Sequence, residues 1–433
     1  MANPAVESLK YNYVVIESLD GQTKLDITNS IISCDYFEDI LSPCVTMSMI
    51  LMNSASLVNF LPIRGGERLG ISVNVYSGEF TRDEEFAMYV YKASEITPGD
   101  TSEFFTLHLV SREALTNETS RCMRRFSGNI KNTVEDILKT ELLTEKFNVD
   151  NIEQTGNSYE FLGNTRKPFT VLTWLGPKGV PTEAGGVSGG QNIGEAKGVA
   201  GFLFWENSDG FNFKSVETLV SNTSLGSADL KDIPTYNYTG AISNSTSNNL
   251  SILSYKIEKN VDLLKSLRVG TYSNYTYFMD FYTGSMNYYK YTLKDEIKSK
   301  LGTEDKIAVS EELGDSPSRI MVRISDRGVL DNSGVVAESG RDVADMAKSV
   351  SRYNILFSQS LNMTVPCNIN LKAGDVIKAE FPALELSNEK EADSKQSGNY
   401  LIKELRHHFE GQKNVTSLKL VRDSYGLYGS NNN

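Results

Sequence analysis

Two stretches at opposite ends of the 433-residue chain follow one pattern, and this constrains the fold more than any other feature. The first reads AMYVYKASEITPGDTSEFFTLHLVSRE (87–113), and the second reads GNYLIKELRHHFEGQKNVTSLKLVRDS (398–424). Each is typical of two strands joined by a loop. Setting Tyr89 against Tyr400 without gaps makes five of the 22 positions from 89 to 110 identical. The matches are Tyr89, Lys92, Leu107, Leu109 and Val110 with Tyr400, Lys403, Leu418, Leu420 and Val421.

The likeness extends upstream of both stretches. GGERLGISV (65–73) precedes the first copy and AGDVIKAEF (373–381) precedes the second, and VTMSMI and LNMTVP lie before those. The shared order of strand, Gly-acid turn, strand, strand, loop and strand indicates one module used twice; two unrelated β-meanders are the alternative. Such a module is a small antiparallel barrel or a strongly bent sheet, with Leu418 and Leu420 facing its inside. Three copies of a chain with two such modules would offer six near-equivalent units to a six-fold partner.

The segment between the modules has a different character. Ile130, Val134, Ile137, Leu138 and Leu142 recur at helical spacing, and Phe169–Leu175 also predicts an amphipathic helix. Residues 176–201 are rich in glycine and predict a mobile surface loop, and GFLFWENSDGFNFKSV predicts a hairpin.

These patterns predict a mainly β fold with some α, of the α+β class. We expect two similar tube-type antiparallel β-barrel domains, at 1–112 and 339–426. The inserted part divides into an α+β domain at 113–225 and a Tyr-rich β region with loops at 226–338, which packs partly with it. Residues 427–433 form a frayed tail.

Charge and hydropathy exclude several classes of protein. The net charge of −12, with no long run of Lys or Arg, argues against a nucleic-acid surface. No stretch of 18 apolar residues occurs, so no membrane span is expected, and the N-terminus lacks the features of a signal peptide. The four cysteines are scattered without C-x-x-C spacing, which favours buried free thiols over disulfides or a metal site.

Catalytic signatures are also missing from the sequence. His407 and His408 are adjacent, so on a strand they point to opposite faces and cannot share one metal, and His108 is expected on a strand. No H-E-x-x-H, G-x-S-x-G or P-loop pattern occurs. The acidic pairs lie in polar settings, unlike the paired carboxylates of a glycosidase cleft. We therefore expect neither an enzyme nor a cofactor, metal or catalytic site.

Several segments between residues 100 and 426 resemble the central baseplate hub protein of contractile-tailed bacteriophages, in the order of that family. They include LVSREALTNETSRCMRRFSGNIKNTVEDIL, RVGTYSNYTYFMDFYTG and the C-terminal copy of the repeat. The most specific pair is KPFTVLTWL with GFLFWENSDGF, and its core positions are Trp174, Phe202, Phe204, Trp205 and Phe211. The structural residues that we expect in the barrel strands are Tyr89, Leu107, Leu109, Tyr400, Leu418 and Leu420.

The resemblance implies a homotrimer whose two tube-like domains per chain build a ring with pseudo-six-fold symmetry. One face would meet the hexameric tail tube or a tube-initiator protein, the other a trimeric spike that often carries a lysozyme domain, with baseplate wedge proteins around it. DNA would pass through without specific binding. The protein would lie in the tail baseplate of the virion after assembly in the host cytoplasm. The spike protein VgrG of type VI secretion shares this architecture.

Two alternatives remain open at this point. One is a carbohydrate-binding or hydrolytic tail component, for which Trp174 and Trp205 could serve as sugar platforms, although their apolar runs favour a role in the core. The other is a secretion-system spike protein, which would usually continue into a β-helical needle, and this sequence ends at Asn433 without one.

Overall fold

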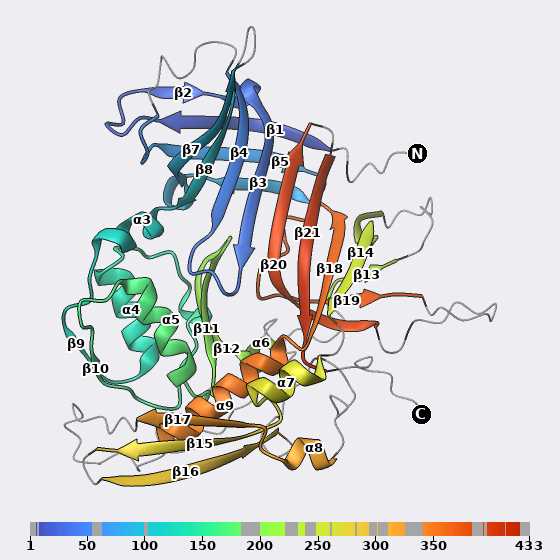
Figure 1. Ribbon diagram of the computed structural model, residues 1–433. Coiled ribbons are helices and arrows are strands. Elements are labelled where there is room, and N and C mark those ends of the chain that lie inside the picture. Colours follow the sequence, from blue (N-terminus) through green and yellow to red (C-terminus); the bar gives the residue numbers. More distant parts are fainter. Residues whose placement is uncertain are drawn as a thin grey trace.

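The structure is a computed structural model. It describes residues 6, 8–53, 63–98, 103–182, 200–220, 233–238, 248–259, 262–281, 284–293, 301, 311–324, 341–382, 393, 396–411 and 413–424. In Figure 1 the first module (blue) lies above, and the second module (red) stands beside it. A teal and green α+β unit and a small sheet with helices lie below. The prediction of a mainly β fold with some α is confirmed.

One large sheet contains the strands of both modules. Along its main path the order is β14-β18-β21-β20-β3-β4-β8-β7-β5-β1-β2, with β6 on β5, β19 on β20 and β13 on β19. The strands are β1 (Leu9–Glu17), β2 (Lys24–Asp26), β3 (Ile31–Asp39), β4 (Thr46–Asn53), β5 (Arg68–Val75), β6 (Gly78–Arg82), β7 (Met88–Pro98), β8 (Glu103–Ser111), β13 (Thr235–Asn237), β14 (Ser254–Lys259), β18 (Gln359–Pro366), β19 (Val376–Glu380), β20 (Gly398–Glu410) and β21 (Lys413–Arg422).

The two modules are joined edge to edge. Residues Glu404–Glu410 of β20 pair antiparallel with Ser33–Asp39 of β3, so the sheet runs from one module into the other without a break. The two similar antiparallel β modules that we expected are present, but the pairing of β20 with β3 joins them into one sheet. Among the described residues, the pairings connect the modules and do not close either one on itself.

The inner face of the bent sheet holds two apolar cores. The first contains side chains of β1, β3, β4, β5, β7 and β8, and the second contains side chains of β18, β19, β20 and β21. β20 contributes to both, because Tyr400, Ile402 and Leu405 lie in the second core while Phe409 lies in the first. Alternation along one continuous strand places these side chains on the same face, once a bulge at Lys403 is allowed for.

The α+β unit has its own core and packs beneath the first module. Its elements are α3 (Arg112–Thr119), β9 (Arg125–Phe126), α4 (Ile130–Thr140), β10 (Phe161–Leu162), α5 (Pro168–Leu175), β11 (Phe202–Asn207), β12 (Gly210–Ser215) and α6 (Val216–Val220). Asn129 caps α4 by accepting a hydrogen bond from the Lys131 N–H at 3.0 Å, and Pro168 begins α5. β11 and β12 form the predicted hairpin, with Asn207 opposite Gly210.

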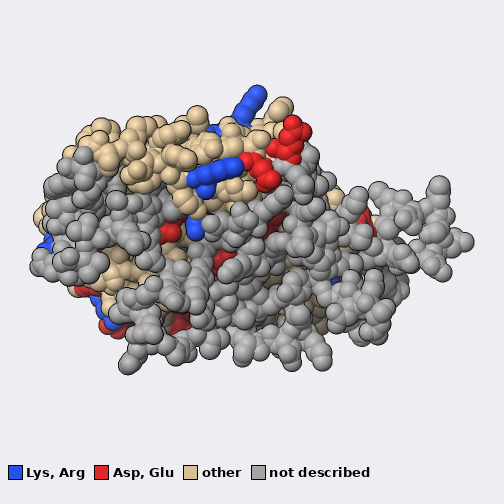
Figure 2. Space-filling model, turned by 90° about the horizontal axis from the view of Figure 1, so that it is seen from below, with Lys and Arg blue, Asp and Glu red and all other residues tan. Residues whose placement is uncertain are grey.

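A second small sheet lies at the lower end of the molecule. Its strands β15 (Ser273–Asp280), β16 (Ser285–Thr292) and β17 (Arg319–Ile324) are accompanied by α7 (Leu263–Val269), α8 (Glu311–Asp315) and α9 (Arg341–Leu356). One face carries the buried Asn274, Thr276 and Phe278. The other exposes Met286, Tyr288, Ile320, Val322 and Ile324. Figure 2 views this end of the molecule, where its described surface shows only scattered Lys, Arg, Asp and Glu.

Several expectations fall outside what the structure describes. Most of the Gly-rich segment 176–201 and the tail 427–433 lie outside the described residues. The proposed domain boundaries stay predictions. No helix among the described residues is long and apolar enough to cross a membrane.

Candidate functional site

The two modules share their strand order. In the first, β4, β8, β7 and β5 lie side by side, and in the second β18, β21, β20 and β19 do. A β-bulge interrupts the pairing at the same step in both modules: Val90 faces Leu109 before the bulge and Lys92 faces His108 after it. In the second module Ile402 faces Leu420, and Glu404 faces Lys419. A bulge at an equivalent position is strong evidence that the modules are copies, since bulges are specific features of a fold.

This comparison corrects the gap-free alignment of the sequence. Leu107, Leu109 and Val110 do correspond to Leu418, Leu420 and Val421. In the preceding strand, however, the bulges align only if Tyr89 corresponds to Leu401 and Met88 to Tyr400. The Tyr89–Tyr400 and Lys92–Lys403 identities were therefore coincidental, because the stretch between the paired residues is one residue shorter in the second copy: Val90 and Leu109 are 19 positions apart, and Ile402 and Leu420 are 18.

The turn before β5 and β19 is also present twice. Gly66 (φ 97°) and Gly374 (φ 99°) both adopt a left-handed conformation that favours glycine. The Gly66 N–H donates to the Val90 carbonyl at 2.6 Å, and the Gly374 N–H donates to the Ile402 carbonyl at 2.9 Å. The acidic residue that follows accepts a backbone hydrogen bond in each copy. Arg64 N–H donates to Glu67 Oε1 at 2.7 Å, and Lys372 N–H donates to Asp375 Oδ2 at 2.9 Å.

The predicted barrel positions lie on both sides of the sheet. Leu107, Leu109, Leu418 and Leu420 are buried in the two cores, and Tyr400 joins them in the second. Tyr89 is only half-buried and lies on the outer face beside Arg68. Their role in assembly stays a prediction.

A cluster of charges lies across the seam, which is the line where β3 of the first module pairs with β20 of the second. These side chains are on the outer face of the sheet, opposite the two cores, and around the seam we call this the open face. The Arg406 guanidinium donates to both oxygens of Asp35, at 2.8 and 2.9 Å, and His408 Nδ1 lies 2.6 Å from Asp35 Oδ1. Such a bidentate contact fixes geometry as well as charge. Lys403 pairs with Asp39 at 3.5 Å at the other end of the seam. The alternating polar residues of β20 were visible in the sequence, but nothing there indicated β3 as their partner.

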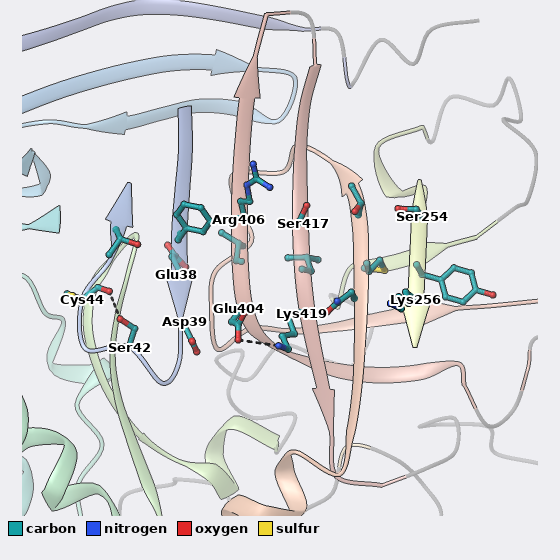
Figure 3. Close-up of a pocket in the computed structure, with 18 residues that line it drawn as sticks. Glu38, Asp39, Ser42, Cys44, Ser254, Lys256, Glu404, Arg406, Ser417 and Lys419 are labelled. Atoms are coloured by element: carbon teal, nitrogen blue, oxygen red, sulfur yellow. Dashed lines mark hydrogen bonds and ion pairs between the residues drawn. The ribbon is translucent and has the colours of Figure 1, made fainter. Parts of the chain in front are cut away.

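The open face around the seam is hollowed and close to charge-neutral. Figure 3 shows a depression of about 950 Å³ that is lined by both modules. Its charged lining includes two acidic side chains (Asp39 and Glu404) and three basic ones (Lys256, Arg406 and Lys419), while Glu38 also borders it but has its carboxylate buried on the inner side of the sheet. The remaining lining is largely polar or small, such as Ser42, Thr46, Ser254, Asn362 and Ser417.

The α+β unit holds the turn of the second module through a buried polar junction. Ala373 is contacted from two sides, because its N–H donates to Glu38 Oε2 at 2.8 Å and its carbonyl accepts from Trp205 Nε1 at 3.0 Å. Tyr36 also donates to Glu38, and Arg82 donates to Tyr36. Burial raises the pKa of Glu38 to about 8 and lowers that of Arg82 to about 10.

Further ionisable groups are buried around this junction. Burial raises the pKa of Glu206 to about 7 and that of Asp375 to about 6. Burial lowers the pKa of His407 to about 3, and the nearby Arg82 adds to the effect. Deeper in the molecule Arg352 donates to Glu217 at 2.9 Å and to Asp423 at 3.0 Å, which ties α9 to α6 and to the end of the second module. The charge of Arg352 is tolerated at this depth because two carboxylates pair with it.

The core motif implied by the resemblance is assembled in space. Phe202, Phe204 and Phe211 are buried in the core of the α+β unit. Trp205 points the other way, toward Ala373 of the second module, and is 1% exposed. Trp174 is half-buried and packs against Phe161, with ring centroids 5.2 Å apart. The ring of Trp205 is thus inaccessible as a sugar platform.

The described residues contain no group of three or more His, Cys, Asp or Glu that could hold a metal ion. His407 and His408 point to opposite faces of the sheet, as predicted, since the first is buried in the inner core and the second lies on the open face. All four cysteines are free; Cys34, Cys122 and Cys367 are buried and Cys44 is half-buried. We therefore take as the candidate site the jointed sheet, that is, the sheet in which β20 and β3 join the two modules.

Comparison with known proteins agrees with this architecture. No protein-family model matches the sequence, and no curated protein matches it. Among solved structures, the tail protein from Neisseria meningitidis MC58 superposes with a TM-score of 0.52 at 11% identity, covering 96% of this chain and 97% of that one. The chain has the fold of a tail protein. The tail-protein fold implied by the sequence resemblance is therefore confirmed.

Two prophage tail proteins are similar as well. The 43 kDa tail protein of prophage MuSo2 from Shewanella oneidensis gives a TM-score of 0.48 at 8% identity, with 95% of this chain and 98% of that chain covered. A prophage tail protein from Listeria monocytogenes EGD-e gives 0.48 at 10% identity, with 95% and 94% covered.

Proposed function

We propose that this protein is a structural hub of a phage tail, a homotrimeric ring of pseudo-six-fold symmetry that joins a hexameric tail tube to a trimeric central spike. The supporting observation is the duplicated module. Strand order, bulge and Gly-acid turn recur in both copies, so three chains would present six nearly equal units. A chain with a single module would have to change symmetry by other means.

The open face of the jointed sheet is the part of the molecule suited to line the ring. Acidic and basic side chains pair with each other around the seam, Arg406 with Asp35 and Lys419 with Glu404. A DNA passage needs such a surface, because an excess of Lys and Arg would bind the phosphate backbone and retain the DNA. We propose that the ring lets DNA pass without specific binding, and that the protein acts by geometry and load transfer and not as an enzyme.

Light scattering and imaging test this proposal. Three chains of 48.0 kDa give an expected mass of 3 × 48.0 = 144 kDa, and images of the particle should show a ring with three-fold or apparent six-fold symmetry. A monomer that persists at micromolar concentration would contradict the hub. A lytic role would be revealed by release of sugar fragments from purified cell walls, which we do not expect.

A further inference from the structure

The two strands that form the seam, β20 and β3, each have an equivalent strand in the other module. These two equivalent strands lie at the ends of an eight-strand run of the sheet and, among the described residues, do not pair with each other. The run is β14-β18-β21-β20-β3-β4-β8-β7, and it consists of two sets of four strands. β3 stands beside β4 as β14 stands beside β18, and β20 stands beside β21 as β7 stands beside β8. The seam joins β20 to β3. The equivalent strands that remain are β7 and β14.

Both of these strands have a free edge within the described part of the chain. β7 pairs with β5 only at Met88 and Tyr89, as β19 pairs only with the first part of β20. Beyond that point Tyr91 is 51% exposed, and no described strand pairs with this side of β7. β14 pairs with β18 on one side only, and almost all of its residues are exposed. Exposed strand edges present unpaired N–H and C=O groups that favour pairing with another chain.

The exposure of individual side chains supports this equivalence. Residues of β3 and β14 can be matched through the residues that they pair with on the equivalent strands β4 and β18. On this basis Cys34 corresponds to Tyr255, and Tyr36 corresponds to Ile257. Cys34 and Tyr36 are 0% exposed, and next to them β20 contributes His407 and Phe409 across the seam. Tyr255 and Ile257 are 37% and 40% exposed, although they belong to the same inward-facing row. Within the described structure, these two side chains lack a neighbouring strand in the position that β20 occupies beside β3.

We infer that β7 of one copy pairs antiparallel with β14 of a second copy of this chain, repeating the internal seam between chains. The register of the seam places Arg406 opposite Phe37, and the corresponding pair is Ser94 opposite Lys259. The contact is head-to-tail, so it closes into a ring when the rotation per chain divides the circle. This inference rests on the proposed function, and it assigns the ring contact to two named strands.

Cross-linking tests the pairing directly. In a chain that carries both Ser94→Cys and Lys259→Cys, a short bis-maleimide should join neighbouring chains into covalent dimers and trimers. Each single variant should give only monomers on a denaturing gel, and an equimolar mixture of the two should give dimers but no trimers. Phe37→Cys with Arg406→Cys is the matched control: this pair should link within one chain. Wild type, treated alike, reports on Cys44 and the buried thiols.

A substitution on the exposed row provides the second measurement. Ile257→Asp should convert the trimer to monomers at micromolar concentration while leaving the melting temperature of the monomer unchanged. Lys256→Gln, on the opposite face of the same strand, should leave the trimer intact.

The outcomes separate the two ideas. A trimer that neither cross-links through residues 94 and 259 nor responds to Ile257→Asp would overturn the inference and leave the proposed ring standing. A wild-type protein that never forms a trimer would overturn both.

Discussion

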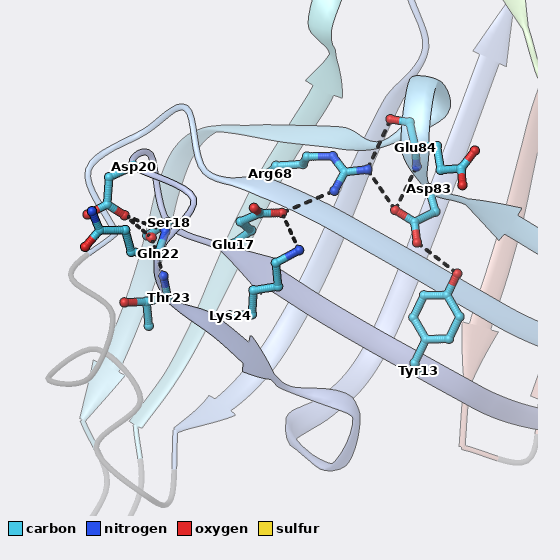
Figure 4. Close-up of polar contacts among 10 residues, drawn as sticks. All are labelled: Tyr13, Glu17, Ser18, Asp20, Gln22, Thr23, Lys24, Arg68, Asp83 and Glu84. Atoms are coloured by element: carbon cyan, nitrogen blue, oxygen red, sulfur yellow. Dashed lines mark hydrogen bonds and ion pairs between the residues drawn. The ribbon is translucent and has the colours of Figure 1, made fainter.

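The two modules share their strand order, one bulge and the Gly-acid turn, but the side chains on their outer faces have different environments. In the first, Arg68 and Tyr89 form a registered pair on the outer face, and Arg68 contacts Glu17 at 3.2 Å and Asp83 at 2.9 Å (Figure 4). In the second, the equivalent pair is Val376 and Leu401, and both are buried against the α+β unit. After a duplication the hydrogen-bond frame can thus stay fixed while the outward side chains specialise. One copy faces solvent, and the other anchors the rest of the chain.

The inner faces of the modules should be equally intolerant of charge. Leu418→Asp would place an unpaired carboxylate in the second core, and we expect a loss of more than about 4 kcal/mol in the free energy of unfolding. Leu107→Asp is the equivalent change in the first core and should cost about the same. Urea titration measures both, with Lys419→Ala on the open face as the control. A Leu418→Asp protein of unchanged stability would mean that this strand faces water.

The pH dependence should expose the buried polar junction in which Glu38 of the first module meets the turn of the second. The pKa of Glu38 is raised to about 8, so the folded state holds its proton more tightly than the unfolded state does. This contribution is fully present below the ordinary glutamate pKa and is lost as pH rises toward 8, with a limiting slope of about 1.4 kcal/mol per pH unit. Glu206 (about 7) and Asp375 (about 6) act in the same direction over lower windows.

Glu38→Gln should therefore flatten the decline in unfolding free energy between pH 5 and pH 8. Denaturant titrations at several pH values measure this, and Glu410→Gln on an exposed side chain is the matched control. An unchanged slope in the Glu38 variant would show that another group controls stability in this range.

The two turn glycines should differ in cost although their backbone angles match. An added Cβ at Gly374 would lie 2.7 Å from Cζ2 of Trp205, whose ring is held by its hydrogen bond to Ala373. At Gly66 it would lie 2.7 Å from a methyl of Leu19, which is 63% exposed and can turn away. We expect Gly66→Ala to cost about 1 kcal/mol from the left-handed backbone alone, and Gly374→Ala about 2–3 kcal/mol. Thermal melts followed by tryptophan fluorescence would measure both, and equal costs would contradict the asymmetry.

The smallest expected effect lies at the seam. Arg406 is 43% exposed at its side chain, so its pair with Asp35 is partly screened by solvent. A double-mutant cycle with Asp35→Ala and Arg406→Ala should give a coupling energy of up to about 1 kcal/mol. A value near zero would show that this ion pair adds nothing to the link that the backbone pairing of β3 with β20 provides.

Much of this architecture could be predicted from the sequence. The second strands of the repeat carried a strong enough pattern, with Leu107 and Leu109 matching Leu418 and Leu420, to place both modules. The Gly-acid turns were visible too, because their backbone needs glycine. The first strands were aligned one residue off, since Tyr89 and Tyr400 matched by chance and a one-residue difference in the length between the two strands leaves no local trace.

The contacts between modules could not be predicted in the same way. Pairing between β3 and β20 joins residues more than 360 positions apart, and backbone hydrogen bonds carry no signature of side-chain type. No sequence pattern singled out Glu38 and Arg82, because their burial depends on contacts with Ala373 and Ser208, which are distant in the sequence. Residues whose environment is set by distant segments are the ones that sequence patterns miss.

The shared strand β20 also has a mechanical consequence. Its first half belongs to one core and its second half to the other, and seven consecutive residues bind it to β3. A pull that separates the modules along the strand direction would load these hydrogen bonds in shear, all at once, instead of unzipping them singly. Neither module could melt without exposing its neighbour, so tension applied to one end of the chain would be carried through to the other.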